Sequence, residues 1–170
     1  MHTPGRGEGA LRRHRVSLSG ASYFLTLCIE SISRRSLDDQ TARAIRTEIL
    51  SIESDTHWLV RAGVIMPDHL HLLVRLTGGL AISRCIARLK AKTRPALSQR
   101  DSRWQPNFYE HRLRPDEPVE EVVRYIFLNP YRASLVSSGE PYPWFWLGPD
   151  ESAWFSPTTS DGKPFPDWLR

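Results

Sequence analysis

The sequence predicts an α+β fold in which helices lie on one face of an antiparallel sheet. Runs with an apolar residue at every second position, typical of strands, alternate with runs whose apolar residues recur every three to four positions, typical of helices. Two of the strand-like runs are separated only by Pro67 and Asp68, a connection too short for parallel strands, so they are expected to form an antiparallel hairpin. The order strand, helix, two strands, helix, strand is ferredoxin-like.

The first half of the chain supplies most of these elements. Tyr23–Glu30 alternates two sets of side chains and is expected to be a strand. In the helix expected next, Ile45, Ile49 and Ile52 fall on one face. Gly78 and Gly79 interrupt the pattern before a second helix. The predicted bounds are Asp38–Glu53 for the first helix, His57–Met66 and His69–Leu76 for the hairpin strands, and Leu80–Leu97 for the second helix.

The second half is expected to hold one more strand and one more helix. Asp116 is the expected N-cap of that helix, and Pro118 lies in its first turn, where a missing N–H costs little. Pro130 disfavours helical backbone at the residue before it, so the helix is expected to end near Asn129. The predicted bounds are Phe108–Leu113 for the strand and Val119–Asn129 for the helix.

The chain is organised as one domain with a distinct segment at each end, as its 170 residues suggest. Residues 1–19 form a basic, irregular arm, residues 20–136 hold the predicted elements, and residues 137–170 form a tail rich in Pro and Trp. The tail holds four of the six tryptophans and is expected to be ordered but irregular. Cys28 and Cys85 lack metal-type spacing and are expected to stay reduced, as small apolar side chains.

Composition argues against several classes of protein. A hydrophobic fraction of 40% can build a core, but no apolar run approaches the roughly 20 residues needed to span a bilayer. The arginines near the N-terminus are not followed by the apolar core of a signal peptide. There is no Walker-type loop or Gly-rich phosphate cradle. We therefore expect a cytoplasmic protein with no membrane partner.

Positive charge is concentrated in two places. Residues 1–136 carry 21 Lys and Arg against 14 Asp and Glu, whereas residues 137–170 carry 2 against 5. Clustered bases in a chain of pI about 9.4 suit a phosphate backbone. The alternative is a solvated helix face. The candidate DNA-binding residues are Arg12, Arg13 and Arg15 in the arm, and Arg84, Arg88, Lys90, Lys92 and Arg94 in the second predicted helix.

Two histidines stand two residues apart in the second strand of the predicted hairpin. Side chains alternate along a strand, so His69 and His71 point to the same face, while Leu70, Leu72 and Val74 point to the other. Neutral imidazole is the commonest protein ligand for a divalent metal. The pair is therefore either half of a metal site or two half-buried histidines with ordinary hydrogen-bond partners.

A phenol and an amide come together in the last predicted helix. Tyr125 and Asn129 are four residues apart, which places both on one face of that helix, near its end. A phenol can act as a nucleophile, and an amide oxygen can ligate a hard cation. The alternatives are a packed tyrosine and a polar residue at a helix terminus.

Four blocks of the sequence resemble one family in their order and spacing. The blocks are Arg12–Arg15 with Ser17–Gly20 and Tyr23–Thr26, then Met66–His71, then Trp104–Gln105 with Phe108–Arg114, and last Tyr125–Val136 with Tyr142–Trp144. Over roughly residues 12–146 they resemble the IS200-type transposases that use a single tyrosine, most closely the REP-associated tyrosine transposases. Two departures stand out, because Ser19 replaces a common proline and Tyr131 replaces a common small aliphatic residue.

This resemblance implies a role for each candidate residue. Tyr125 would be the nucleophile that joins the 5′ phosphate of single-stranded, hairpin-forming, REP-like DNA. His69, His71 and Asn129 would bind a divalent cation, and a donor set without thiolate favours Mg²⁺ or Mn²⁺ over structural Zn²⁺. The place of action would be a bacterial cytoplasm, in association with the nucleoid. A monomer is the preferred assembly, and a homodimer that exchanges the tyrosine helix is the alternative.

Two other functions remain open at this point. One is a protein that binds DNA hairpins with little or no catalysis, although a pure binder has no need of the full His69, His71, Tyr125 and Asn129 set. The other is a metal-dependent hydrolase unrelated to DNA. The basic cluster and the lack of a paired-carboxylate metal set argue against that hydrolase.

Overall fold

The computed structural model describes residues 17–31 and 37–155. These residues form an antiparallel sheet with strand order β4-β1-β3-β2-β6, and β5 pairs with β1 beside β4. The α+β sheet architecture predicted from the sequence is confirmed. The strands are β1 (Ser22–Ser31), β2 (Trp58–Ile65), β3 (His69–Leu76), β4 (Ser102–Trp104), β5 (Tyr109–Arg112) and β6 (Phe145–Leu147), and the helices are α1 (Asp39–Ser54), α2 (Ile82–Ser98), α3 (Val119–Arg132) and α4 (Pro149–Trp154).

Strand β1 is the hub of the sheet. It pairs with β3 along one edge, and with β5 and then β4 along the other. Its odd-numbered side chains from Tyr23 to Leu27 are buried in the core beneath α1 and α2. Its even-numbered side chains, including Phe24 and Thr26, therefore face the opposite side of the sheet.

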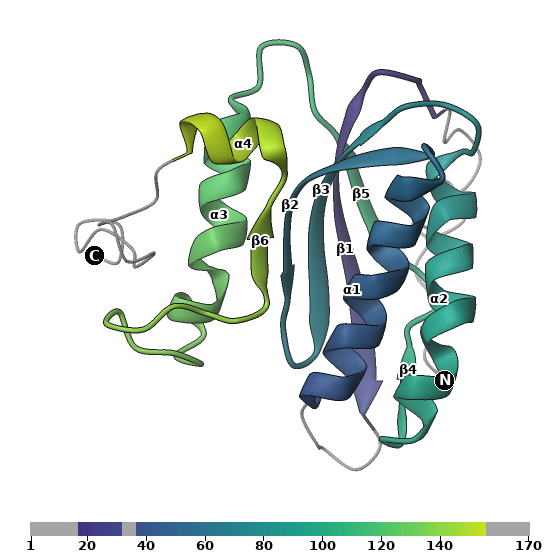
Figure 1. Ribbon diagram of the computed structural model, residues 1–170, viewed down its shortest axis with the longest axis vertical. Helices are drawn as coiled ribbons and strands as arrows, with labels where there is room; N and C mark the ends of the chain where they lie inside the picture. The colour runs from purple at the N-terminus through teal and green to yellow at the C-terminus, as the bar shows by residue number, and fades with distance from the viewer. Residues whose placement is uncertain (1–16, 32–36, 156–170) are drawn as a thin grey trace, which may run out of the picture.

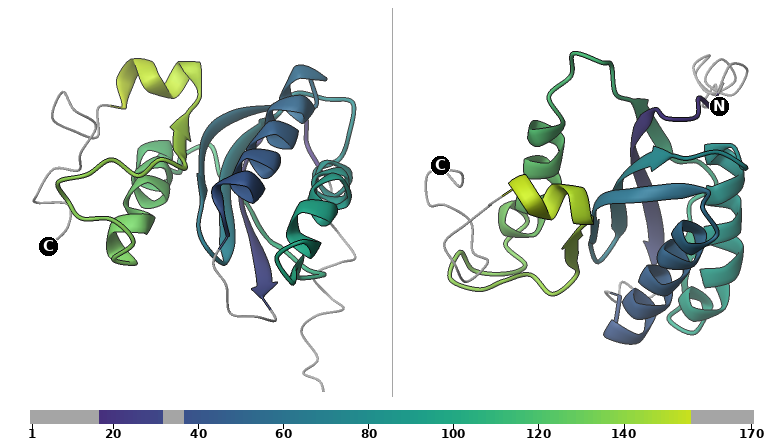
Figure 2. Two further views of the ribbon diagram at one scale, coloured as in Figure 1. Left: turned by 60° about the horizontal axis from the view of Figure 1, so that its bottom comes forward. Right: turned by 45° about the horizontal axis from the view of Figure 1, so that its top comes forward.

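Helices α1 and α2 lie side by side on one face of the sheet (Figures 1 and 2). Asp38 caps α1 by accepting a hydrogen bond from the backbone N–H of Thr41 at 2.8 Å. The apolar stripe of α1 (Ile45, Ile49 and Ile52) is fully buried against the strands, as its spacing predicts. This half of the molecule has the ferredoxin-like arrangement that the sequence predicts.

Helix α3 lies on the opposite face, where it packs against β2 and β3 (Figure 2). An irregularity between Val60 and Ala62 shifts the alternation of β2, so that Ala62 and Val64 turn toward α3. Together with Leu73 they make a second apolar surface, and Val123 and Ile126 of α3 cover it. The sequence-based expectation placed helices on one face only, because periodicity tells which residues are buried but not which face of a sheet they cover.

Helix α3 is longer than predicted. It begins at Val119 with Pro118 in the N-cap position and no side-chain cap, so the prediction of Asp116 as N-cap is wrong. It also continues through Pro130 to Arg132 instead of ending near Asn129. Proline in the last turn removes a single backbone hydrogen bond, and here its ring is buried, which offsets that loss. Tyr131 consequently lies on the helix and not beyond it.

The C-terminal segment contains regular structure where irregular chain was expected. Strand β6 pairs antiparallel with β2, with Trp146 opposite Gly63, and α4 follows it. Glu151 of α4 is buried and accepts a hydrogen bond from Arg61 at 2.6 Å, which ties α4 to β2. A strand of three residues is too short to carry a periodic signal, so neither β6 nor β4 was predicted. In the part of the chain described here, no helix combines the length and the apolar character required to cross a bilayer.

Substitution of Gly63 by Ala tests the docking of β6. An added Cβ would overlap the indole ring of Trp146, which lies directly against Gly63. Such overpacking typically costs about 1–3 kcal/mol, so we expect the Tm to fall by roughly 2–10 °C in calorimetry. Gly139→Ala is the matched control, because its nearest neighbour, the Ser137 hydroxyl, is 3.8 Å from the added Cβ. Equal Tm values for the two variants would contradict this packing.

Candidate active site on the α3 face of the sheet

His69 and His71 lie on β3 and point to the same face, as the strand period predicts. Their ring centroids are 4.5 Å apart at an interplanar angle of 71°. The intervening Leu70 is fully buried on the other face, in the core under α1 and α2. The two imidazoles therefore form a close pair on the face that α3 partly covers.

One ring nitrogen of each histidine is already engaged. The Nδ1 of His71 is 2.9 Å from the hydroxyl oxygen of Thr26 on the neighbouring strand. The Nδ1 of His69 is 2.6 Å from a carboxylate oxygen of Asp68 in the hairpin turn. Such partners fix the tautomer and the orientation of metal-ligating histidines. With Nδ1 engaged, Nε2 is the ring nitrogen that can bind a metal. Asp68 thus does more than shape the turn.

His71 is held in its neutral form. Burial, followed by the charge of neighbouring His69, lowers the pKa of His71 to about 3. A neutral imidazole keeps a lone pair on the nitrogen that carries no proton, which is the form that binds a metal.

Tyr125 meets this histidine pair from α3. The centroid of its ring is 5.4 Å from that of His71, at an interplanar angle of 62°. Phe24 of β1 stacks on His71 at 5.3 Å and meets Tyr125 edge-on at 5.8 Å, so a single aromatic ring supports both residues. Tyr125 is nevertheless 42% exposed, which leaves its side chain open to a substrate.

Asn129 lies one helical turn after Tyr125 on α3 and is partly exposed. Its side-chain amide makes no hydrogen bond within residues 17–31 and 37–155. Over these same residues, no three His, Cys, Asp or Glu side chains lie together as a metal site. The donor set that these residues offer is two imidazoles and an amide oxygen. Such a set fits a divalent cation that keeps some of its coordination positions for water or substrate.

Tyr131 is placed away from these residues. It is 7% exposed, packs on Phe127, and donates a hydrogen bond from its hydroxyl to the carbonyl oxygen of Glu140 at 2.9 Å. Burial raises the pKa of the Tyr131 phenol, which disfavours the phenolate form. Tyr131 is therefore a packing residue.

The basic residues predicted to bind DNA divide into three groups. Arg88 is engaged by Glu48, Asp55 and Ser51 of α1 and its C-cap, and Lys90 donates to backbone carbonyls of residues 105–107. Arg84, Lys92 and Arg94 are exposed and take part in no ion pair with another described residue. Arg12, Arg13 and Arg15 lie outside the described residues. Helix α2 covers the face opposite to His71, so its bases do not border the histidine pair.

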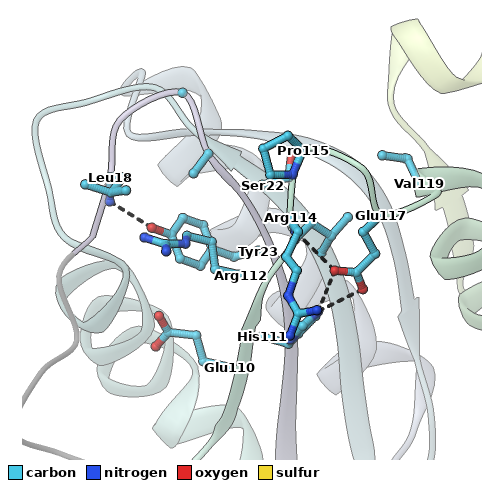
Figure 3. Close-up of a pocket in the computed structure, with 13 residues that line it drawn as sticks. Leu18, Ser22, Tyr23, Glu110, His111, Arg112, Arg114, Pro115, Glu117 and Val119 are labelled. Atoms are coloured by element: carbon cyan, nitrogen blue, oxygen red, sulfur yellow. Dashed lines mark hydrogen bonds and ion pairs between the residues drawn. The ribbon is translucent and has the colours of Figure 1, made fainter.

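A pocket of about 880 Å³ lies where residues 18–23 meet β5 and the link to α3 (Figure 3). Its lining does not include His69, His71, Tyr125 or Asn129. Arg112 and Arg114 contribute positive charge, and Glu110 and Glu117 balance it. Both oxygens of Glu117 contact His111 Nε2 at 2.8 Å, and this bond, ahead of the one from the Arg114 N–H, lowers the pKa of Glu117. This pocket therefore lacks the one-sided charge of a simple phosphate site.

Reasoning from the sequence missed the partners of the histidine pair. Thr26 and Phe24 lie on the same face of β1 as His71 does on β3, and the register pairs Thr26 with His71. Their alternation with buried Leu25 was visible in the sequence, but the pairing of β1 with β3 was not. Tyr109 of β5 pairs with Thr26 from the other side and was also not singled out.

Comparison with known proteins gives three similarities. A family model described as Transposase IS200 like matches residues 19–127. A REP-associated tyrosine transposase of Escherichia coli is 25% identical over 130 residues, which is 76% of this chain and 78% of the relative. A Haemophilus influenzae protein assigned provisionally to the same group is 27% identical over 161 residues, 85% of this chain and 90% of the relative.

One solved structure matches the fold closely. It is a REP-associated tyrosine transposase bound to a REP hairpin, with a TM-score of 0.66 and 25% sequence identity. The match covers 79% of this chain and 81% of the other. The sheet and the helices described above therefore have a counterpart in a solved protein.

Proposed function

The chain belongs to the IS200-like transposase family, and from this premise we propose that it nicks single-stranded DNA at hairpin-forming, REP-like sequences and transfers the cut strand. The two sequence relatives are of the REP-associated tyrosine group, and the solved relative carries a REP hairpin. The approach of Tyr125 to within 5.4 Å of His71, between two elements distant in sequence, is the observation that carries the proposal.

The proposed reaction uses Tyr125 as the nucleophile. Its phenolic oxygen, after losing its proton to solvent, attacks the scissile phosphorus and forms a P–O bond to the protein. The bond from phosphorus to the 3′ oxygen breaks, and that oxygen takes up a proton and leaves as a 3′-OH. The resulting 5′-phosphotyrosine conserves the bond energy. A second 3′-OH can therefore reverse the reaction or redirect it without ATP.

His69, His71 and Asn129 are the residues we propose to hold a Mg²⁺ or Mn²⁺ ion. When bound, such an ion polarises the phosphoryl group and offsets the charge that develops on it. Thr26 and Asp68 keep the two imidazoles in the orientation that leaves Nε2 available. Phe24 fixes the His71 ring and contacts Tyr125, so the histidine pair and the phenol keep their relative positions.

One experiment tests the proposal against its two alternatives. The protein is incubated with Mn²⁺ and a hairpin oligonucleotide labelled on the 3′ side of the cleavage position, then run on native and denaturing gels. A covalent protein–DNA adduct supports the transposase chemistry. A shifted band on the native gel without an adduct favours a hairpin-binding protein with no catalysis. The absence of both an adduct and a shifted band favours a hydrolase that does not act on DNA.

We expect the basic N-terminal arm to contribute to binding through charge. Replacing Arg12, Arg13 and Arg15 by Gln removes three positive charges, and each lost phosphate contact should flatten the slope of log K against log salt by roughly 0.7–0.9. Hairpin affinity measured between 50 and 200 mM salt, with conditions that prevent cleavage, gives this slope. Arg84→Gln with Lys92→Gln and Arg94→Gln is the companion variant for the α2 group. An unchanged slope in both variants would contradict an electrostatic role for either group.

We further propose that the protein acts as a monomer, in a bacterial cytoplasm where the nucleoid DNA lies. All four site residues come from one chain, and α3 packs on the sheet of its own chain through Val123 and Ile126. Helix α3, which carries Tyr125, therefore packs on an apolar surface of its own chain and needs no partner subunit for this.

A further inference from the structure

Tyr109 is an exposed aromatic residue beside the histidine pair. The β-sheet register places Tyr109 opposite Thr26, and Thr26 opposite His71, so the three side chains form one row across β5, β1 and β3. The ring of Tyr109 meets Phe24 at 6.3 Å and 67°. Phe24 thus contacts Tyr109 as well as His71 and Tyr125.

The fold does not account for a tyrosine at this position. The residue is 58% exposed, the most of any large hydrophobic side chain in the described part of the protein. Its contact with Phe24 leaves most of the ring in solvent, and its hydroxyl makes no hydrogen bond to another described residue. An exposed aromatic side chain within reach of a nucleophile is suited to bind a flat, apolar ligand surface.

The neighbourhood indicates which ligand. Tyr109 and Tyr125 both meet Phe24 on one face of the sheet, so a DNA strand held at Tyr125 would pass beside the ring of Tyr109. Exposed aromatic rings are a usual means of holding unpaired nucleotides, since every base offers a flat face. Stacking needs a base that is not paired, which excludes the stem of a hairpin and points to its single-stranded flank.

We propose that Tyr109 stacks on the unpaired base of a nucleotide adjacent to the phosphate that Tyr125 attacks, and so positions that phosphate at the histidine pair. This inference rests on the proposed function. Tyr109 is a positioning residue here, because its ring touches the base and not the reacting atoms. Loss of one base–aromatic stack lowers affinity by roughly 5- to 150-fold, and we expect the loss to appear in KM while kcat stays within about twofold.

The test combines variants of the protein with variants of the DNA. Tyr109→Ala removes the ring, whereas Tyr109→Phe keeps the ring and removes only the hydroxyl. Trp154→Ala is the matched control, an exposed aromatic residue of α4 whose ring contacts Phe155. Each protein is assayed for adduct formation with Mn²⁺ on hairpins in which single unpaired nucleotides around the cleavage position are made abasic, one at a time.

We expect one abasic position to reproduce the defect of Tyr109→Ala. With that DNA, wild-type protein and Tyr109→Ala should react alike, because the stack is missing in both cases. On intact DNA, Tyr109→Phe and Trp154→Ala should behave as wild type. The proposal would be overturned if the defect of Tyr109→Ala multiplied with the defect of the abasic DNA at every position. Loss of the adduct in Tyr109→Phe would also overturn it, since the hydroxyl would then take part in the chemistry.

A binding measurement separates this proposal from the proposed function. 2-Aminopurine placed at each unpaired position reports stacking through quenching of its fluorescence, and it requires no cleavage. Quenching at one position that persists in Tyr109→Phe and disappears in Tyr109→Ala supports the stack, even if the wild-type protein forms no adduct. Equal quenching in all the proteins overturns the stack, even if the adduct forms normally.

Discussion

Replacing Tyr125 by Phe is expected to abolish covalent attachment to DNA. The substitution removes one oxygen and keeps the ring that meets His71 at 5.4 Å and Phe24 at 5.8 Å. Because the side chain is 42% exposed, the variant should fold normally, with stability within about 0.5 kcal/mol of wild type. Loss of a covalent nucleophile lowers turnover by several orders of magnitude, so no adduct should be detected on a denaturing gel with labelled hairpin and Mn²⁺. Hairpin affinity should be unchanged.

The matched control is Tyr131→Phe. It removes the hydrogen bond from the Tyr131 hydroxyl to the carbonyl oxygen of Glu140, which should cost about 1 kcal/mol of stability without affecting the adduct. Peptide mapping of the wild-type adduct should locate the DNA on Tyr125. An adduct that persists in Tyr125→Phe and vanishes in Tyr131→Phe would reverse the assignment. Cleavage without any adduct in either variant would indicate hydrolysis with no tyrosine intermediate.

Replacing His71 by Ala is the second change for which we expect a large effect. It removes one proposed metal ligand together with the ring that lies between His69 and Tyr125. Loss of a partner that merely orients a ligand typically costs 10–100-fold in metal affinity or activity, so loss of the ligand should cost roughly 100-fold or more. Mn²⁺-dependent adduct formation should fall by at least that factor. Hairpin binding should persist, because phosphate contacts come from Arg and Lys.

Two companion variants separate the metal role from a packing role. His69→Ala removes the other imidazole, which is less buried, and should produce the same loss of Mn²⁺-dependent activity. Leu70→Ala alters the residue between them, which points into the opposite core, and should lower the Tm without changing the apparent Mn²⁺ affinity. Isothermal titration calorimetry with Mn²⁺ measures that affinity directly. Full activity of a His69→Ala, His71→Ala double variant would show that the histidine pair is not the metal site.

The fold was predictable wherever a local signal was strong. The bounds of β3 (His69–Leu76) were predicted without error, because Pro67 and Asp68 mark its start and the Gly pair at 78–79 follows its end. The stripe of α1 was predicted because isoleucines recur at helical spacing. What failed depends on tertiary structure. The continuation of α3 through Pro130 depends on burial of that ring, and β6 exists only because β2 offers it an edge.

The candidate site was predictable in its parts but not in its assembly. A period of two puts His69 and His71 on one face, and a spacing of four puts Tyr125 and Asn129 on one face, from sequence alone. No periodicity relates the strand to the helix, and the approach of Tyr125 to His71 follows from the packing of α3 on Ala62 and Val64. Of the basic residues, Arg88 was indistinguishable in sequence from its neighbours, although its ion pairs with Glu48 and Asp55 tie α2 to α1.

The separation of the histidine strand from the tyrosine helix along the chain has a consequence for the timing of biogenesis. Ribosomes add roughly 5–20 residues per second, so the 54 positions from His71 to Tyr125 take about 3–11 s to make. The hairpin that carries the histidines is complete at residue 76, while α3 begins at Val119 and β6 at Phe145. A nascent chain therefore acquires two of its three proposed metal ligands, His69 and His71, before its nucleophile. A translation product that stops short of α3 would carry both imidazoles and have no means of joining itself to DNA.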